Sequence, residues 1–247
     1  MLIAGASASA AASLAGCAST NPSPVIQSAA LPPPQPSSPQ APQKVAEAIE
    51  PNYREIYAEV KGEPFPVPAI KLAQIDQAFL RKIVSYPAKE PPGTIVIDPA
   101  NRYLYHVEEG GTATRYGVGV GREGFVWSGV ASIKSKQEWP DWYPPKEMLV
   151  RRPDMKKQLT GLQSGIGMHG GPGNPLGARA MYLWQGNQDT LFRIHGTIEP
   201  WTIGQNVSSG CIRMINQDVM HLYERTPVGT RVVVLGPNAQ PVKVANG

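Results

Sequence analysis

A series of short runs of β-branched and aromatic residues after Gly93, separated by glycine and proline turns, limits the folds open to this chain. Runs of this kind are typical of β-strands. They cover residues 94–98, 103–107, 113–120, 129–135, 180–184, 191–196 and 231–235. One clear late helix is expected near Asn216–Arg225, where Pro227 closes an apolar helical pattern. The pattern predicts a mainly β domain with a few helices, built as a largely antiparallel β-sandwich or barrel-like sheet.

Charge divides the chain into two parts. Residues 1–43 contain no Asp, Glu, Lys or Arg, so every charged residue lies within 44–247. The 247 residues include 23 Lys and Arg against 19 Asp and Glu, which gives a net charge of +4. A globular part therefore follows a non-globular one. A charge this small and evenly spread does not predict nucleic-acid binding, although it suits an anionic partner such as a cell-wall polymer.

Residues 1–16 are small or apolar and end in Leu14-Ala15-Gly16, directly before Cys17. The stretch is shorter than the roughly 20 apolar residues that a membrane-spanning helix needs. It fits the apolar region and cleavage site of a secretory signal, although no Lys or Arg precedes it. Residues Leu14–Cys17 resemble a bacterial lipobox, which implies cleavage before Cys17 and lipid modification of that cysteine. A signal peptide or tail with a chance cysteine is the alternative.

Two further segments precede the predicted β domain. Residues 17–44 carry prolines at 22, 24, 32, 33, 34, 36, 39 and 42. Such a segment predicts a disordered, extended tether that spans on the order of 80 Å. In residues 45–92, Asp76 is expected to cap a helix with Phe79, Leu80, Ile83 and Val84 on its apolar face. The expected organisation is a signal at 1–16, a tether at 17–44, a short helical extension at 45–92, the predicted β domain at 93–236 and a tail at 237–247.

The residues with the clearest chemical potential are His195 and Cys211. His195 ends a predicted strand, and Cys211 follows the small residues Ser208-Ser209-Gly210. Main-chain N–H groups and the Arg213 cation favour the thiolate, which is the nucleophilic form. The loop also offers N–H groups to an oxyanion. A Cys/His pair of this kind suits acyl transfer, although a cysteine is more often a small buried apolar residue. A Cys17–Cys211 disulfide is possible by count alone.

The same residues resemble a known family. His195-Gly-Thr and Ser208-x-Gly-Cys-Ile-Arg, with fifteen residues between His195 and Cys211, are together similar to the signature of the L,D-transpeptidases of the YkuD or ErfK/YbiS group. The resemblance covers most of residues 93–236. It includes Tyr116-Gly-Val-Gly-Val-Gly121 and Asn174-Pro-Leu-Gly-Ala-Arg-Ala180. Ser209 departs from the pattern, because the family commonly has His at this position.

The resemblance implies a YkuD-like β-sandwich and a role for each matched residue. Cys211 is then the nucleophile, His195 the general base, and the carbonyl of Gly196 the group that orients the imidazole. Ser209 and Gly210 belong to the oxyanion loop. Four further residues are candidates for substrate binding, namely Arg213, Ser208, Thr197 and Arg179. For Arg179, a structural ion pair is an equally good interpretation.

The implied reaction is acyl exchange on peptidoglycan stem peptides. Cys211 attacks the L-centre of diaminopimelate, D-Ala leaves, and an amine of a second stem peptide or of a protein resolves the thioester. The family needs no metal or cofactor. Water as acceptor would make the chain an L,D-carboxypeptidase, and a non-catalytic peptidoglycan-binding lipoprotein is a further alternative. A papain-like peptidase does not fit, because there the cysteine precedes the histidine.

Other candidate sites have weaker support. Gly119-x-Gly-x-x-Gly124 matches a dinucleotide-binding pattern, but a strand rather than a helix is expected after it. A zinc site from Cys211, His195 and His221 lacks the close pairing of ligands that such sites show. His169 and the aromatic residues Trp139, Trp142 and Tyr143 lie in glycine- or proline-rich loops, where a structural role is at least as good an interpretation as a place in the cleft.

Overall fold

A computed structural model describes residues 51–87, 89–121, 127–208, 210–236 and 239. The predicted signal, Cys17, the tether and most of the predicted C-terminal tail lie outside these residues. The helices are α1 Tyr53–Ile56, α2 Lys146–Arg151 and α3 Asn216–Arg225. The strands are β1 Lys82–Ser85, β2 Ile95–Asp98, β3 Tyr103–Glu108, β4 Thr112–Gly117, β5 Val120–Gly121, β6 Gly129–Glu138, β7 Thr160–Leu162, β8 Gly165–Gly167, β9 Arg179–Gln185, β10 Gln188–His195, β11 Asn206–Ser208, β12 Ile212–Arg213 and β13 Arg231–Val234.

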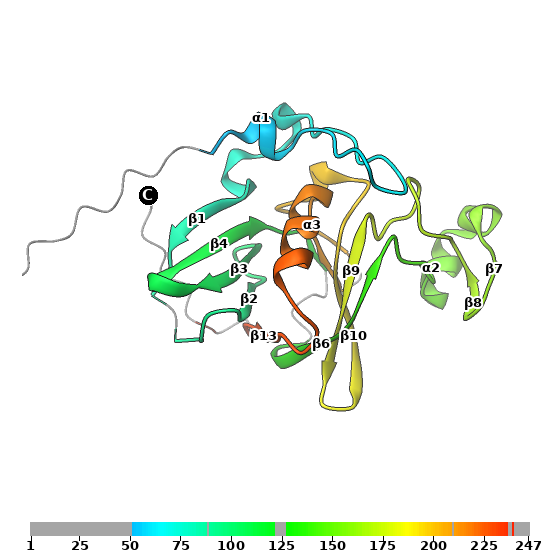
Figure 1. The fold of residues 1–247 in the computed structure, drawn as a ribbon. Coiled ribbons are helices and arrows are strands. Elements are labelled where there is room, and N and C mark those ends of the chain that lie inside the picture. Colours follow the sequence, from blue (N-terminus) through cyan, green and yellow to red (C-terminus); the bar gives the residue numbers. More distant parts are fainter. Residues whose placement is uncertain (1–50, 88, 122–126, 209, 237–238, 240–247) are drawn as a thin grey trace, which may run out of the picture. The chain divides into compact units, whose positions relative to one another are not determined.

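Most of the strands belong to one mixed sheet. In the described part of the chain its order is β1-β4-β3-β2-β13-β6-β9-β10-β12. Strand β13 pairs with β2 in parallel and with β6 antiparallel, so it joins the two halves of the sheet. Helix α3 lies between these halves (Figure 1). The prediction of a mainly β fold with few helices is confirmed, and the predicted helix at Asn216–Arg225 coincides with α3.

The main core lies between the sheet and α3. Strands supply alternating apolar side chains, and α3 supplies Val219 and Leu222. The strand members of this core include Ile95, Ile97, Leu104, Tyr116, Ile133, Met181, Leu183, Ile194, Ile212 and Val232. Ile194 and Ile212 are next to His195 and Cys211 in the sequence. The two candidate catalytic residues are therefore attached to the most buried part of the fold.

The prediction of a helical extension is wrong for its second half. Residues Gln77–Phe79 form a single 3-10 turn, in which the Asp76 carboxylate accepts a hydrogen bond from the Ala78 N–H. Ile83 and Val84 lie on β1, which pairs with β4 at one edge of the main sheet. Their β-branched side chains favour a strand, and pairing with β4 outweighs the helical spacing. Val84 is buried, whereas Ile83 is exposed.

Buried polar contacts hold the extension against α3. Asp218 is fully buried and accepts a hydrogen bond from the Tyr57 hydroxyl at 3.0 Å, while its second oxygen lies 3.6 Å from Nε of Arg81. Gln217 Nε2 donates to the carbonyl oxygens of Ala58 and Pro68, each at 3.0 Å. The extension therefore fixes the first turn of α3, and that turn carries a residue of the candidate site.

Within the described ranges, no helix combines the length and the apolar character needed to cross a bilayer.

Candidate active site

His195 is fixed in position by the sheet and by its own neighbour. Its main chain pairs with Ala180 of β9 and Arg213 of β12. Its side chain is buried, and Nδ1 lies 2.6 Å from the carbonyl oxygen of Gly196. A carbonyl oxygen only accepts, so Nδ1 carries the proton and Nε2 keeps its lone pair. Burial lowers the pKa of His195 to about 4. The Arg213 cation also lowers this pKa, whereas the hydrogen bond with the Gly196 carbonyl raises it by less than burial lowers it. At neutral pH the ring is therefore an uncharged proton acceptor.

Asn216, at the start of α3, holds the chain around Gly196. Its Oδ1 accepts from the N–H groups of Ala178 and Thr197 at 3.0 and 3.2 Å, and its Nδ2 donates to the Thr197 carbonyl at 3.0 Å. A Cβ atom on Gly196 would collide with Oδ1 of Asn216 and lie 3.2 Å from Val219 Cγ1. This position therefore requires glycine. The sequence analysis missed Asn216, whose only signal was its place at the start of the predicted helix.

Cys211 lies directly before β12, beside the strand that ends at His195. The next residue, Ile212, pairs with Ile194 of β10. The Cys211 Sγ lies 4.0 Å from the carbonyl oxygen of Leu191, and the main-chain N–H of Arg193 is close enough to lower the pKa of the thiol. The sheet thus places Cys211 against the segment of β10 that immediately precedes His195.

The ionisation of Cys211 differs from the sequence-based expectation. Burial is the largest influence and raises the pKa of the thiol. The Arg193 N–H and the cations of Arg193 and Arg213 lower it, but by less. The predicted contribution of N–H groups and Arg213 is therefore present, whereas the predicted preference for thiolate is wrong because burial outweighs it. The resting pair is a neutral thiol and a neutral imidazole.

Arg213 lies on β12 with its side chain nearly covered. Its Nη1 donates to Oε2 of Glu199 and to Oγ1 of Thr202, both at 3.0 Å. Its main chain exchanges two 2.8 Å hydrogen bonds with Gly119. These contacts fix the guanidinium close enough to lower the pKa values of both His195 and Cys211.

Arg179 lies at the start of β9 and binds the N-terminal extension. Its guanidinium forms a two-point ion pair with Glu63, at 2.9 and 2.7 Å. Glu63 also accepts from Nε1 of Trp139 at 2.9 Å. Because the Arg179 side chain is only 6% exposed, this geometry favours the structural ion pair over a role in binding substrate.

The remaining candidate residues are Thr197 and the loop residues Ser208, Ser209 and Gly210. Ser209 lies outside the described residues, and of Ser208 only the main chain is described, at the end of β11. Gly210 is buried with a φ of +125°, a conformation that favours glycine, and a Cβ there would lie 3.3 Å from the Phe192 ring. Thr197 is buried, and its hydroxyl accepts from the Glu199 N–H at 3.0 Å.

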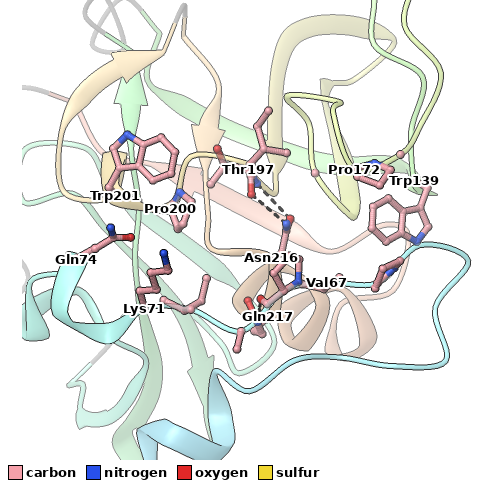
Figure 2. Close-up of a pocket in the computed structure, with 17 residues that line it drawn as sticks. Val67, Lys71, Gln74, Trp139, Pro172, Thr197, Pro200, Trp201, Asn216 and Gln217 are labelled. Carbon is pink, nitrogen blue, oxygen red and sulfur yellow. Dashed lines mark hydrogen bonds between the residues drawn. The ribbon is translucent and has the colours of Figure 1, made fainter.

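A cavity of about 360 Å³ adjoins the site on the side of the extension. Its walls are residues 66–71 and Gln74, the 197–201 loop, the start of α3, and the loop residues Trp139, Gly171, Pro172 and Gly177. Figure 2 shows Thr197 and Asn216 joined by hydrogen bonds at this cavity. Thr197 lines it, but neither Cys211 nor His195 does. The cavity is thus next to the candidate catalytic pair and separate from it.

The other histidines are engaged elsewhere. His106 lies buried on β3, and Nδ1 of His221 is 2.8 Å from the Tyr116 hydroxyl on the inner side of α3. His169 is largely exposed, 3.3 Å from Asp141.

Comparison with known proteins identifies the domain. The family model described as the L,D-transpeptidase catalytic domain, YkuD, matches residues 92–234. The chain belongs to this family. The match contains β2 to β13 and both candidate catalytic residues.

Individual relatives agree with this assignment. The probable L,D-transpeptidase ErfK/SrfK of Escherichia coli K12 is 35% identical over 154 residues, which are 60% of this chain and 45% of the relative. The probable L,D-transpeptidase YbiS of the same organism is 32% identical over the same share of each chain. The chain thus spans about half the length of the curated relatives it matches.

A solved structure from Brucella melitensis, described as a probable carnitine operon oxidoreductase, is 53% identical, covers 67% of this chain and 99% of its own, and has a TM-score of 0.44.

Proposed function

We propose that this chain is a cysteine-dependent L,D-transpeptidase that acts on peptidoglycan stem peptides. The observation that carries the proposal is the arrangement around β10. Cys211 lies against this strand, and the strand ends at His195, whose proton is held on Nδ1 by the Gly196 carbonyl. Family membership supplies the reaction class, and the geometry supports a role for each group.

The first step forms a thioester. Nε2 of His195 takes the proton from the neutral Cys211 thiol as the sulfur attacks the carbonyl carbon at the L-centre of diaminopimelate. Main-chain N–H groups of the 208–211 loop are proposed to stabilise the oxyanion. The bond to the terminal D-Ala breaks, and its nitrogen leaves with the proton held on Nε2. Since burial lowers the pKa of His195 to about 4, its protonated form is a stronger acid than an ordinary imidazolium and gives this proton to the leaving nitrogen.

The second step transfers the acyl group. An amine of a second stem peptide, or of a protein, attacks the thioester while Nε2 accepts its proton. The new amide forms and the Cys211 thiol is regenerated. With water as acceptor, the same residues would act as an L,D-carboxypeptidase.

We propose that the enzyme is exported to the cell envelope and anchored by lipid on Cys17. The support is the apolar segment 1–16, the Leu14–Cys17 motif and the proline-rich residues that follow. This tether would let the catalytic domain reach wall polymer from a membrane surface. Periplasmic location follows from the same proposal.

The test is mass spectrometry of the full chain incubated with muropeptide tetrapeptides. Cys211→Ala is the inactive control, and Cys17→Ser is the matched control for the loss of a cysteine. We expect dimers joined through two diaminopimelates with the unmodified chain and with Cys17→Ser, and none with Cys211→Ala.

Other products would change the assignment. Tripeptide without dimer would make the chain a carboxypeptidase under these conditions. Unchanged tetrapeptide, together with failure of a carbapenem to acylate Cys211, would indicate a non-catalytic peptidoglycan-binding protein.

A further inference from the structure

Strand β10 is irregular immediately before His195. Asp189 pairs with Trp184 of β9, and Arg193 pairs with Tyr182, so the three residues between Asp189 and Arg193 face a single residue of β9. Leu191, at the centre of this bulge, has a φ of +62°, and its side chain is exposed. A left-handed conformation is unfavourable for leucine, so the surrounding contacts hold it there. Such bulges often redirect groups beside active sites.

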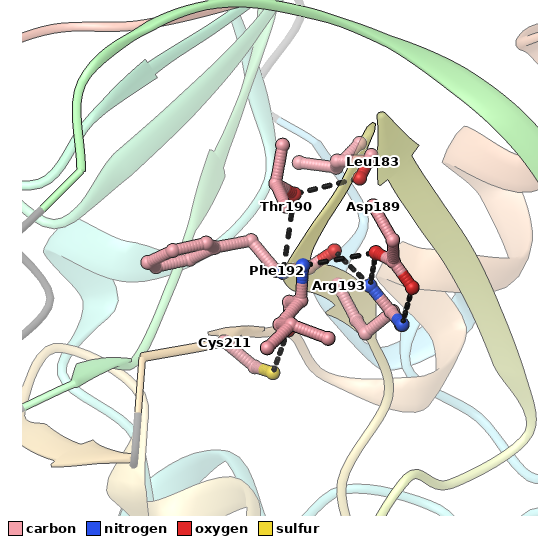
Figure 3. Close-up of polar contacts among 7 residues, drawn as sticks. Leu183, Asp189, Thr190, Phe192, Arg193 and Cys211 are labelled. Atoms are coloured by element: carbon pink, nitrogen blue, oxygen red, sulfur yellow. Dashed lines mark hydrogen bonds and ion pairs between the residues drawn. The ribbon is translucent and has the colours of Figure 1, made fainter. Parts of the chain in front are cut away.

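Asp189 holds the bulge with both carboxylate oxygens. Its Oδ1 accepts from the Leu191 N–H at 2.9 Å and from Nη1 of Arg193 at 2.7 Å, and its Oδ2 accepts from Nη2 of Arg193 at 2.7 Å. Figure 3 shows these contacts beside the Cys211 sulfur. A two-point pair between arginine and a carboxylate is strongly directional. Asp189 thus connects Leu191, at the centre of the bulge, to Arg193, at its end.

Thr190 supports the same shape. Its hydroxyl donates to the Leu183 carbonyl at 2.6 Å and accepts from the Phe192 N–H at 3.2 Å (Figure 3). The Phe192 ring in turn lies against Gly210, next to the nucleophile.

Main-chain groups of this bulge lie close to the Cys211 sulfur. The Leu191 carbonyl faces Sγ at 4.0 Å, and the main-chain N–H of Arg193, at the end of the bulge, lowers the pKa of the thiol. A carbonyl acceptor stabilises the thiol, whereas an N–H donor and a nearby cation stabilise the thiolate. A regular strand would have no left-handed residue at Leu191 and would present different groups to the sulfur.

We propose that Asp189 is a positioning residue for Cys211, which holds the β10 bulge so that the Leu191 carbonyl and the Arg193 N–H are directed at the sulfur. Asp189 acts through these two main-chain groups and through the Arg193 guanidinium, without touching substrate. The inference rests on the proposed role of Cys211 as the nucleophile.

The test measures the reactivity of the Cys211 thiol itself. The full chain is alkylated with iodoacetamide across a range of pH, and mass spectrometry follows the Cys211 peptide so that Cys17 does not interfere. We expect Asp189→Ala to slow alkylation at neutral pH by about tenfold and to shift the midpoint up by about one pH unit. Asp189→Asn keeps an acceptor for the Leu191 N–H but loses the charge, and is expected to be slower by about threefold. The matched control is Glu90→Ala, which removes the carboxylate of the Glu90–Arg231 pair and is expected to match the unmodified chain.

Unchanged alkylation profiles for both Asp189 variants, even with a lower melting temperature, would overturn the proposal, because a purely structural role would affect stability alone. If Asp189→Ala does not fold, as judged by circular dichroism, Asp189→Asn decides the question. Iodoacetamide needs no peptidoglycan, so failure of the transpeptidase assay and failure of this inference are separate outcomes.

Discussion

The Nδ1 atom of His195 lies 2.6 Å from the carbonyl oxygen of the next residue, Gly196. The group that orients the imidazole is therefore main chain, and no side-chain substitution removes it directly. Its position depends instead on the space around Gly196, which Asn216 fills.

Gly196→Ala tests this dependence. The new methyl group would meet Oδ1 of Asn216, so either the Gly196 carbonyl or the first turn of α3 has to move. We expect a loss of stability of about 1–3 kcal/mol. We also expect acylation of Cys211 by a carbapenem to slow by at least about tenfold. Chemical denaturation and intact-protein mass spectrometry measure the two effects. Gly161→Ala is the matched control, since nothing lies within 4 Å of a Cβ at Gly161. Normal acylation in Gly196→Ala would show that the Gly196 carbonyl does not need to be so closely held.

The pH dependence of acylation tests the state of His195. Since its pKa is lowered to about 4, the imidazole is neutral and able to accept a proton throughout the mildly acidic range. We expect the carbapenem acylation rate to be flat between about pH 5 and pH 8, without an inflection near 6.5. His169→Gln, which changes an exposed histidine, should give the same profile. An acid limb centred near pH 6.5 would contradict the burial of His195.

Arg213 is expected to influence both catalytic groups through charge. Arg213→Gln removes a cation that lowers the pKa values of His195 and Cys211, so both values should rise. The acid limb of acylation then moves up from about 4, and iodoacetamide alkylation of Cys211 at neutral pH slows by about threefold. Arg213→Lys retains the charge and should restore the alkylation rate, although it loses the contacts with Glu199 and Thr202. Equal profiles for the Gln and Lys variants would show that charge is not the important property of Arg213.

The buried Asp218 carboxyl group is expected to make the free energy of unfolding depend on pH in an unusual direction. Burial raises its pKa to about 7, although Arg81 and the Tyr57 hydroxyl act in the opposite direction. A carboxyl group with a raised folded-state pKa contributes stability at low pH and loses it as pH rises from about 4 to about 7. Asp218→Asn has no such titration. The stability of this variant relative to the unmodified chain should therefore rise by about 1 kcal/mol per pH unit over this range.

Urea denaturation at several pH values measures the effect for Asp218→Asn. Asp154→Asn changes an exposed carboxylate and should show no comparable trend. A relative stability that falls with rising pH would show that the pairing with Arg81 dominates over burial.

Much of the fold follows from local pattern. The Asn216–Arg225 helix and the strands near residues 95, 103, 129, 180 and 231 were predicted from the sequence. In these segments the spacing of the apolar residues and the position of the flanking turn residues indicate the same element. The short strands β11 and β12 were missed because two or three residues are too few to show the alternation of apolar and polar side chains that indicates a strand. Strand β1 was misread as helix, because the partner that makes it a strand, β4, lies 30 residues further along the chain.

The candidate site divides in the same way. His195, Cys211 and Arg213 were predicted from their residue types and spacing, and Gly196 from the family resemblance. Asn216 and Asp189 were missed, since their importance comes only from contacts with main-chain groups of other segments. Arg179 was ambiguous in sequence, and its partner Glu63 lies 116 residues away.

The amino-acid sequence by itself determined the order of most strands along the chain, the division between an uncharged N-terminal segment and a charged domain, and the candidate residues for acyl transfer. Only the tertiary structure decided that Cys211 is a neutral thiol, that His195 is a neutral imidazole, and that the bulge in β10 lies beside the Cys211 sulfur. Ionisation depends on burial and on charges brought close by folding, and both are properties of the packed chain rather than of neighbouring residues in the sequence.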